Sequence, residues 1–334
     1  MSLHNAKVSF EDLDIGGRTI RIAIPGRPNV CWVTSLATAI GPMAREEIDR
    51  EMDVPESLAA KVLSRIFETF GRWLRIDEAV FVEHRLLSTS LYTHDMLAHL
   101  VACRESLMRH YPGKAIVLRS LNAHDHAAYI DRRCWPFRVV WIIDDIDADW
   151  ATRRDARRDV ARLETSNLDS CAYDGAIPPD KLARCLELYR NLYLGTYSGL
   201  NPDYDYGYLR RLMEAGDLEI LTLEDKGRVE AFCALHSRGD TLSVPMVGYN
   251  QSRPQSDGLY RSAMTRAAQA AQTRGMRLNL SAGAPHFKRH RGAKPYMEYV
   301  MIIEGHLPAW RRFGYSVIGR VLRLMAPELL RSAS

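Results

Sequence analysis

The sequence contains no apolar run long enough to cross a bilayer, which takes about 20 residues. Its longest apolar runs, such as Val139 to Ile143, have the length of strands. The first residues, Met1 to Phe10, include Lys7 but lack the apolar segment of a secretory signal. We therefore expect a protein without a transmembrane segment that works in the cytoplasm.

Motifs for metal binding and for serine hydrolysis are also missing. None of the six cysteines forms CxxC or a zinc-like spacing with histidine, so we expect reduced, mostly buried thiols. The histidines, including His286, His290 and His306, form no HExxH motif or ligand cluster, and we predict no metal. Ser281 has no GxSxG motif around it, which argues against a serine hydrolase.

The composition is that of an ordinary globular protein. Of 334 residues, 46% are hydrophobic and 26% charged, which excludes a disordered or fibrous chain and leaves room for two domains. The net charge is only +4, but Lys and Arg gather between His286 and Arg331. Such a basic surface suits a phosphate-bearing partner, namely coenzyme A, RNA or an anionic membrane; it also fits a merely solvated basic helix.

Alternating strand and helix patterns predict a mixed α/β fold in two halves, residues 1–150 and 151–334. A charged helix near Asp149 to Glu164 is expected to lead from one half into the other. Other expected elements are strands at Arg18–Ile24, Leu218–Leu223, Val229–His236 and Thr241–Tyr249, and helices at Glu56–Arg75, His94–His110, Asp180–Leu194 and Gly258–Arg274.

The two halves also repeat one order of elements. Leu91-Tyr92 and Leu259-Tyr260 each precede a long helix, a glycine break, a strand, a basic loop and an apolar last strand. Repeated order of this kind indicates internal duplication. We therefore expect two related units, with the chemistry in the second.

This order of elements resembles the GNAT acyltransferase superfamily, and the tandem pair is similar to Fem-type, aminoacyl-tRNA-dependent transferases and to GNAT-like enzymes of natural-product biosynthesis. The resemblance implies a pyrophosphate loop, Gln/Arg-x-x-Gly-x-Gly/Ala, before a helix whose free N–H groups hold phosphate. Gln255 and Gly258 match it, and with Tyr260 and Arg261 they are predicted to bind substrate. Tyr260 replaces the small residue, however, and Asp257 would repel a phosphate, so an ordinary capped turn is the alternative.

A basic segment from Ser281 to Ala293 carries the second candidate. The Phe-Lys pair of the Fem group implies that Lys288 meets the reacting carbonyl, where an ammonium can stabilise an oxyanion. Ser281 and Arg291 are predicted to bind substrate beside it. The alternative is a basic surface loop with Phe287 in the core.

Two strand ends supply further candidates. Tyr249 and Asn250 stand where GNAT enzymes admit the acyl group. Tyr249 is a predicted catalytic residue and Asn250 a predicted substrate-binding one, for the acceptor amine or donor carbonyl, although Tyr-Asn is also common turn chemistry. Glu298 interrupts an apolar strand and is predicted to accept the proton of an attacking amine, or else to pair with Arg291.

A last amphipathic helix, Trp310 to Met325, has Trp310, Phe313, Val317, Val321 and Leu324 on one face. A membrane, RNA or its own domain could cover this face, and packing on its own domain is the expectation.

Together these features predict an acyltransferase acting on a small amine, hydroxylamine or hydroxyl acceptor, with no tightly bound cofactor. The expected donor is aminoacyl-tRNA, with acyl-CoA as the alternative. A catalytically silent GNAT-fold binding protein is the competing class. The sequence leaves the oligomeric state open.

Overall fold

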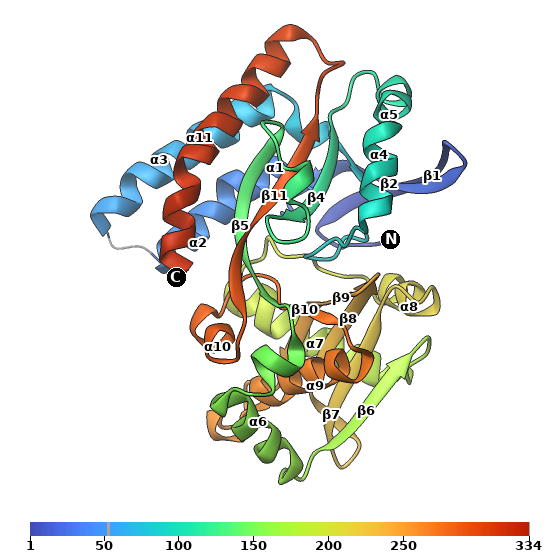
Figure 1. The fold of residues 1–334 in the computed structure, drawn as a ribbon, viewed down its shortest axis with the longest axis vertical. Coiled ribbons are helices and arrows are strands. Elements are labelled where there is room, and N and C mark those ends of the chain that lie inside the picture. Colours follow the sequence, from blue (N-terminus) through green and yellow to red (C-terminus); the bar gives the residue numbers. More distant parts are fainter. Residues whose placement is uncertain (52–53, 334) are drawn as a thin grey trace. The chain divides into compact units, whose positions relative to one another are not determined.

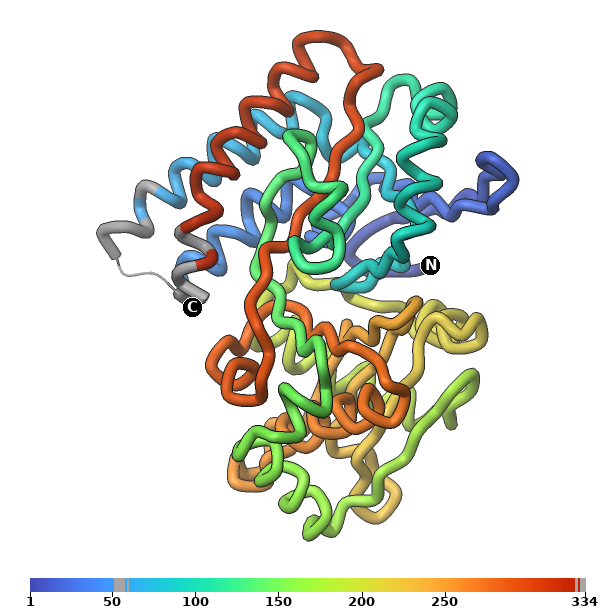
Figure 2. The backbone as a smooth tube through the Cα atoms, in the orientation of Figure 1, coloured from blue at the N-terminus to red at the C-terminus, as the bar shows by residue number. Residues whose placement is uncertain are grey.

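The computed structural model describes residues 1–51 and 54–333, and their contacts divide the chain into two units (Figure 1). Unit 1 comprises Met1–Phe137, Ser198–Asp203 and Glu298–Glu328. Unit 2 comprises Arg138–Tyr197, Tyr204–Met297 and Leu329–Ser334. The strands β5 and β11 each run from one unit into the other, as the chain trace in Figure 2 follows.

Unit 1 is built on a mixed sheet with the strand order β1-β2-β3-β4-β11-β5. β3 and β4 are parallel, while β1-β2, β2-β3 and β4-β11 are antiparallel. The strands are β1 (Ala6–Ile15), β2 (Arg18–Asn29), β3 (Val80–Val82), β4 (Ile116–Asn122), β5 (Cys134–Ile143) and β11 (Lys294–Ile303). Every residue of β4 is buried, as expected for an interior strand.

The helices of unit 1 lie mainly before β3, between β3 and β4, and after β11. They are α1 (Leu36–Thr38), η1 (Ala39–Met43), α2 (Ala44–Glu51), α3 (Val54–Trp73), η2 (Ile76–Glu78), α4 (His94–Ala102), α5 (Arg104–His110), η3 (Ala127–Tyr129) and α11 (Ala309–Ala333). α4 and α5 supply Leu97, Leu100 and Leu107 to a core shared with the sheet.

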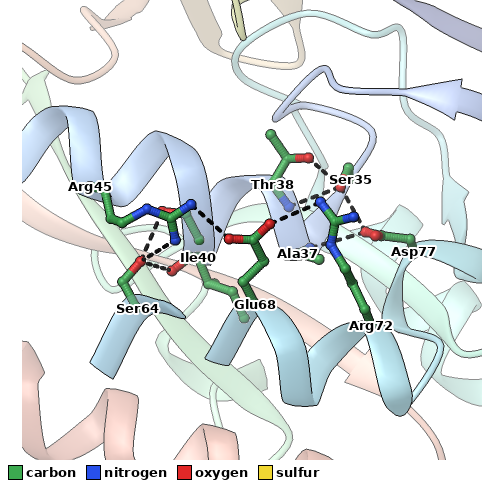
Figure 3. A network of polar contacts seen from close by, with 10 residues as sticks. Ser35, Ala37, Thr38, Ile40, Arg45, Ser64, Glu68, Arg72 and Asp77 are labelled. Atoms are coloured by element: carbon green, nitrogen blue, oxygen red, sulfur yellow. Dashed lines mark hydrogen bonds and ion pairs between the residues drawn. The ribbon is translucent and has the colours of Figure 1, made fainter. Parts of the chain in front are cut away.

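A polar network fastens the start of this helical region to α3 (Figure 3). Asp77 accepts hydrogen bonds from the Ser35 hydroxyl (2.7 Å) and the Ala37 amide (3.0 Å), which holds the first turn of α1. Glu68 on α3 pairs with Arg45 (2.7 Å) and with Arg72 (2.9 Å). These polar contacts hold α1 to η2 and α2 to α3.

Helix α11 crosses α3 and packs on unit 1 through one face (Figure 1). Arg311 is buried and donates to the carbonyls of Leu74 (2.9 Å) and Gly113 (2.8 Å). Gly314 permits this close approach, because a Cβ there would lie 2.3 Å from a methyl of Leu74.

Both α3 and α11 also carry exposed apolar side chains. The exposed residues are Leu58, Val62, Ile66 and Trp73 on α3, and Trp310, Phe313 and Leu324 on α11. The last helix packs on its own unit, as expected, but it does so mainly through Tyr315 and Ile318 and not through the predicted apolar face. In the described part of the chain, no helix has both the length and the apolar character that a membrane crossing requires.

Unit 2 continues from β5 with the strand order β5-β10-β9-β8-β7-β6. β9 and β10 are parallel, and the other pairs are antiparallel. The remaining elements are η4 (Ile146–Trp150), α6 (Arg154–Glu164), β6 (Asp169–Asp174), α7 (Pro179–Arg190), η5 (Asn191–Tyr197), α8 (Tyr206–Glu214), β7 (Glu219–Asp225), β8 (Arg228–Arg238), β9 (Thr241–Tyr249), η6 (Gln255–Asp257), α9 (Leu259–Arg274), β10 (Arg277–Asn279) and α10 (Pro285–His290). α9 buries Ala263, Ala267 and Ala271 in the core of this unit.

The predicted mixed α/β class is confirmed, with several differences in the elements. β2 does not end at Pro25 but continues to Asn29 as a partner of β1. The single helix expected from His94 to His110 is two, divided at Cys103. The first boundary between the compact units falls after Phe137. The domain boundary expected at residue 150 stays a prediction. All six cysteines are free thiols.

Candidate active site

The candidate site of unit 2 begins at the loop between β9 and α9. Gly258 has φ of +67° and caps α9, a left-handed conformation that favours glycine. Beside it lies Arg162 of α6, which donates to the Ser256 carbonyl and approaches to 3.1 Å of the position a Gly258 Cβ would take. Gln255 and Arg261, predicted to bind substrate, are exposed on either side of Gly258. The loop thus has the expected place and the expected glycine.

An aromatic cluster follows this loop. The Tyr260 ring packs edge-on against Phe287 (centroids 5.0 Å apart) and against Tyr249 (6.1 Å). Burial raises the pKa of both tyrosines above that of free phenol, so both remain O–H donors at neutral pH. No described residue accepts a hydrogen bond from either hydroxyl. The two predicted site residues Tyr249 and Tyr260 therefore come together with unused donors.

Lys288 directly follows Phe287 of this cluster in the sequence and is 2% exposed. Its ammonium donates to three backbone carbonyls, those of Leu280 (2.7 Å), Ser281 (3.1 Å) and Ala282 (2.7 Å). Burial, and to a smaller extent the charge of Arg138, holds the pKa of Lys288 well below that of an exposed lysine. Because an ammonium has three donors, all of them are used inside the protein.

The segment that surrounds Lys288 has an unusual backbone. Ser281, Gly283 and Ala284 have φ of +58°, +79° and +50°, and two of these three carry a Cβ. The segment is held by a hydrogen bond from the Trp141 amide to the Ser281 carbonyl (3.1 Å) and by the contacts with Lys288. Residues kept in such conformations by their surroundings concentrate at functional sites.

Arg291 forms a buried ion pair with Asp159 of α6. Its Nε and Nη2 each lie 2.5 Å from Asp159 Oδ2, its Nη1 donates to the Phe287 carbonyl (3.0 Å), and its guanidinium covers the Phe287 ring at 3.7 Å. The alternative that Glu298 pairs with Arg291 is thereby corrected, because the partner is Asp159. Asp159 was not found from the sequence, since it stood among the charges of a helix expected to be solvated.

Asn250 closes a turn after β9. Its side chain donates to Glu230 Oε2 (2.6 Å) and accepts from the Ser252 amide (3.1 Å). This is the turn chemistry that the sequence left as an alternative. A role of Asn250 in substrate binding stays a prediction.

Glu298 belongs to unit 1, where it is 1% exposed and faces Asn122 across the β4-β11 pair. Its role as a proton acceptor stays a prediction. Among residues 1–51 and 54–333, no group of three His, Cys, Asp or Glu side chains is arranged to hold a metal ion.

Comparison with known proteins identifies the class to which this fold and this site belong. The family model of the acetyltransferase (GNAT) domain matches residues 151–289, which contain Gly258, Tyr249, Tyr260 and Lys288. This part of the chain is thus similar to the GNAT family over less than half of the chain's length, and the protein is a GNAT-fold acyltransferase.

The chain is also similar to solved structures at low identity. The structure of L-PGS from Bacillus licheniformis is 13% identical, covers 72% of this chain and 82% of its own, and gives a TM-score of 0.50. FemX is 9% identical over 94% of this chain and 91% of its own, with a TM-score of 0.49. The C-terminal domain of a putative lysylphosphatidylglycerol synthetase from Agrobacterium fabrum is 13% identical over 68% and 77%, with a TM-score of 0.45. The curated proteins contain no significant sequence match.

Proposed function

We propose that this acyltransferase moves an aminoacyl group from aminoacyl-tRNA to a small molecule with an amine, hydroxylamine or hydroxyl group. The observation that carries the proposal is the α9 loop of the GNAT domain. It keeps the glycine of the family's pyrophosphate loop but surrounds it with groups that a nucleotide cofactor does not favour.

Two features of this loop argue against coenzyme A as the donor. Asp257 places a carboxylate at the helix start and pairs with Arg253 (2.7 Å). Tyr260 fills the position of the small residue and packs on Phe287. Arg162 beside Gly258 is a cation that would attract a phosphate, but its guanidinium donates to the Ser256 carbonyl. An ester on the 3′ end of tRNA does not need a pyrophosphate in this loop.

The reaction joins the acceptor nitrogen or oxygen to the carbonyl carbon and breaks the ester bond to the tRNA ribose. The proton lost by the acceptor ends on the ribose hydroxyl that leaves. The hydroxyls of Tyr249 and Tyr260 are available donors for the oxyanion of the intermediate, an interaction worth about 3 kcal/mol for one well-placed donor. Lys288 is the proposed cation at the site, and in the ground state it fixes the 280–282 backbone.

The donor is tested with the purified protein, a mixture of small amines and a tRNA pool charged with radiolabelled amino acids. We expect RNase-sensitive transfer of label to a small product. The same tRNA oxidised at its 3′ end, which cannot be charged, is the control. Activity that survives RNase treatment and requires acyl-CoA would assign the donor to coenzyme A, and binding of either donor without any product would favour the silent binding protein.

A further inference from the structure

Unit 1 contains a pocket of about 600 Å³ between α5, the start of β5, the end of β11 and α11. This volume lies within the range of pockets that hold small molecules. None of the residues that line it belongs to the predicted site residues. The pocket therefore needs an explanation of its own.

Arginines dominate the pocket lining. They are Arg104, Arg132, Arg133, Arg312, Arg320 and Arg323. Among the residues that the structure describes, Arg133 alone of these has a carboxylate partner, Asp131 at 2.5 Å. Glu304 is the one acid in the lining. Like charges gathered in a concave surface focus a positive potential and attract anions.

Two of these arginines donate hydrogen bonds to backbone carbonyls, which orient their side chains. Arg323 donates to the Arg132 carbonyl (2.9 Å) and Arg104 to the Val101 carbonyl (3.0 Å). Arg312 and Arg320, successive cations on the pocket side of α11, have neither an ion pair nor a hydrogen bond from their side chains to any described residue. Their planar donor forks are therefore available to a ligand, and such forks match phosphate oxygens in pairs.

Two buried polar atoms of the lining also lack partners among the described residues. They are Glu304 Oε2 and His306 Nδ1. His306 uses its other nitrogen, which faces the carbonyls of Tyr111 (3.1 Å) and Lys114 (2.9 Å). Unpaired buried polar atoms are uncommon in folded proteins and cost about 1–3 kcal/mol each, so their grouping at one pocket indicates an absent polar ligand.

The pocket has an apolar side as well. Trp135 packs against Tyr315 with ring centroids 5.7 Å apart, and Met108 and Ile303 continue this wall. A ligand that fits the whole lining combines an anionic group with an organic part.

We propose that this pocket binds a small organic phosphate, with its phosphate on Arg312 and Arg320 and its organic part against Trp135 and Met108. The proposal does not depend on the donor or the acceptor of the acyl transfer.

The test is calorimetric titration of the full chain at about 50 mM salt, because added salt weakens charge-based binding. The probes are inorganic pyrophosphate, glycerol 3-phosphate and adenosine 3′,5′-bisphosphate. We expect one site per chain for at least one organic phosphate. A preference for glycerol 3-phosphate indicates a lipid-derived headgroup, and a preference for the adenosine compound indicates a nucleotide.

The double variant Arg312→Gln/Arg320→Gln should weaken this binding by about tenfold or more, the effect of one or two charge-assisted hydrogen bonds. Arg65→Gln/Arg109→Gln removes the same charge from exposed positions of unit 1 outside the pocket and should change affinity by less than about twofold. Ser316→Phe keeps every charge and fills the pocket, so it should also abolish binding.

Equal losses in the two double variants would reduce the binding to general charge attraction and overturn the proposal. So would the absence of binding by all three probes, or binding of tRNA alone. Glu304→Gln supplies a separate check, because an anion site should keep or gain affinity when the only carboxylate is neutralised. A site that binds an amine and loses it in Glu304→Gln would be a cation site instead.

Discussion

Lys288 shows how one side chain can be structural and chemical at once. Replacing it by methionine leaves the carbonyls of Leu280 and Ala282 without a donor, each worth about 1–3 kcal/mol, whereas the Ser281 carbonyl keeps the Trp141 amide. We expect Lys288→Met to lower the free energy of unfolding by several kcal/mol and, in the fraction that folds, to lower kcat about 100-fold. Urea denaturation and turnover per folded molecule measure the two effects separately. Wild-type kcat in folded Lys288→Met would remove this residue from the mechanism and leave it as a support of the 280–282 loop.

The Arg291–Asp159 pair is buried, and removal of one partner leaves an uncompensated charge. Asp159→Asn should destabilise the protein by about 3–5 kcal/mol. The matched control is Asp95→Asn, which breaks an exposed pair with Arg18 (2.7 Å) and should have an effect below about 1 kcal/mol. Denaturation midpoints of the two variants compare them directly, and similar small shifts would show that solvent reaches Asp159.

Glu304 makes stability depend on pH. Burial raises its pKa above the value of 4.5 for an exposed glutamate. The folded protein therefore holds this proton more tightly than the unfolded chain, and the stabilising effect is complete in acid and declines as pH rises through the folded-state pKa. Glu304→Gln cannot ionise, so its melting temperature relative to that of the wild type should rise between pH 4 and pH 8. For the exposed Glu105→Gln, the difference in melting temperature from the wild type should not change with pH. Parallel pH profiles for wild type and Glu304→Gln would contradict this expectation.

At the scale of elements, Gly248 allows β9 and α7 to pack closely. A Cβ at this position would lie 2.5 Å from the Phe232 ring and 2.9 Å from backbone atoms of Leu188 and Tyr189. Gly248→Ala should therefore destabilise unit 2 by about 1–3 kcal/mol, as overpacking does. Gly113→Ala, where a Cβ meets nothing within 4 Å, is the control. Equal stability of the two variants would mean that α7 moves aside freely.

The elements that the sequence predicted well are those with a local signal. Thr241–Tyr249 is a strand with the predicted bounds, and α9 begins after Gly258 as its turn chemistry indicated. The three-residue β3 has almost no pattern of its own, because its pairing with β2 and β4 comes from distant segments. The apolar spacing of α3 predicted a helix correctly, but the side it buries packs against α1, η1 and α2, which the local pattern does not indicate.

The residues of the candidate site also divide into those with a local sequence signal and those without one. Gly258 and Lys288 stand in recognisable local motifs, and the sequence placed both. The partners of Lys288 are backbone carbonyls, which no residue type announces, and Asp159 reaches Arg291 only through the tertiary packing of α6 on α10. The arginine pocket of unit 1 escaped notice because its cations come from three separate segments of the chain.

For the whole molecule, the course of β5 decides where unit 2 begins. Leu278 and Asn279 of β10 pair with Ile143 and Ile142, and Trp141 and Ile143 belong to the core of unit 2. A fragment of residues 138–297 should therefore unfold cooperatively, while residues 151–297, which lack this strand, should not. Circular dichroism during thermal unfolding measures the difference. Cooperative unfolding of the shorter fragment would favour the boundary at residue 150.

The position of β11 bears on how the protein is made. Translation produces β11 last of all strands, yet it lies inside the sheet of unit 1, between β4 and β5. The segment with β1 to β4 thus leaves the ribosome well before β11 but cannot complete its sheet until residues 294–303 have been synthesised. During that interval β4 offers an unpaired, apolar edge, the kind of surface that chaperones bind and proteases attack. A message cut short before residue 294 therefore yields a chain whose oldest segment is the one left unfinished.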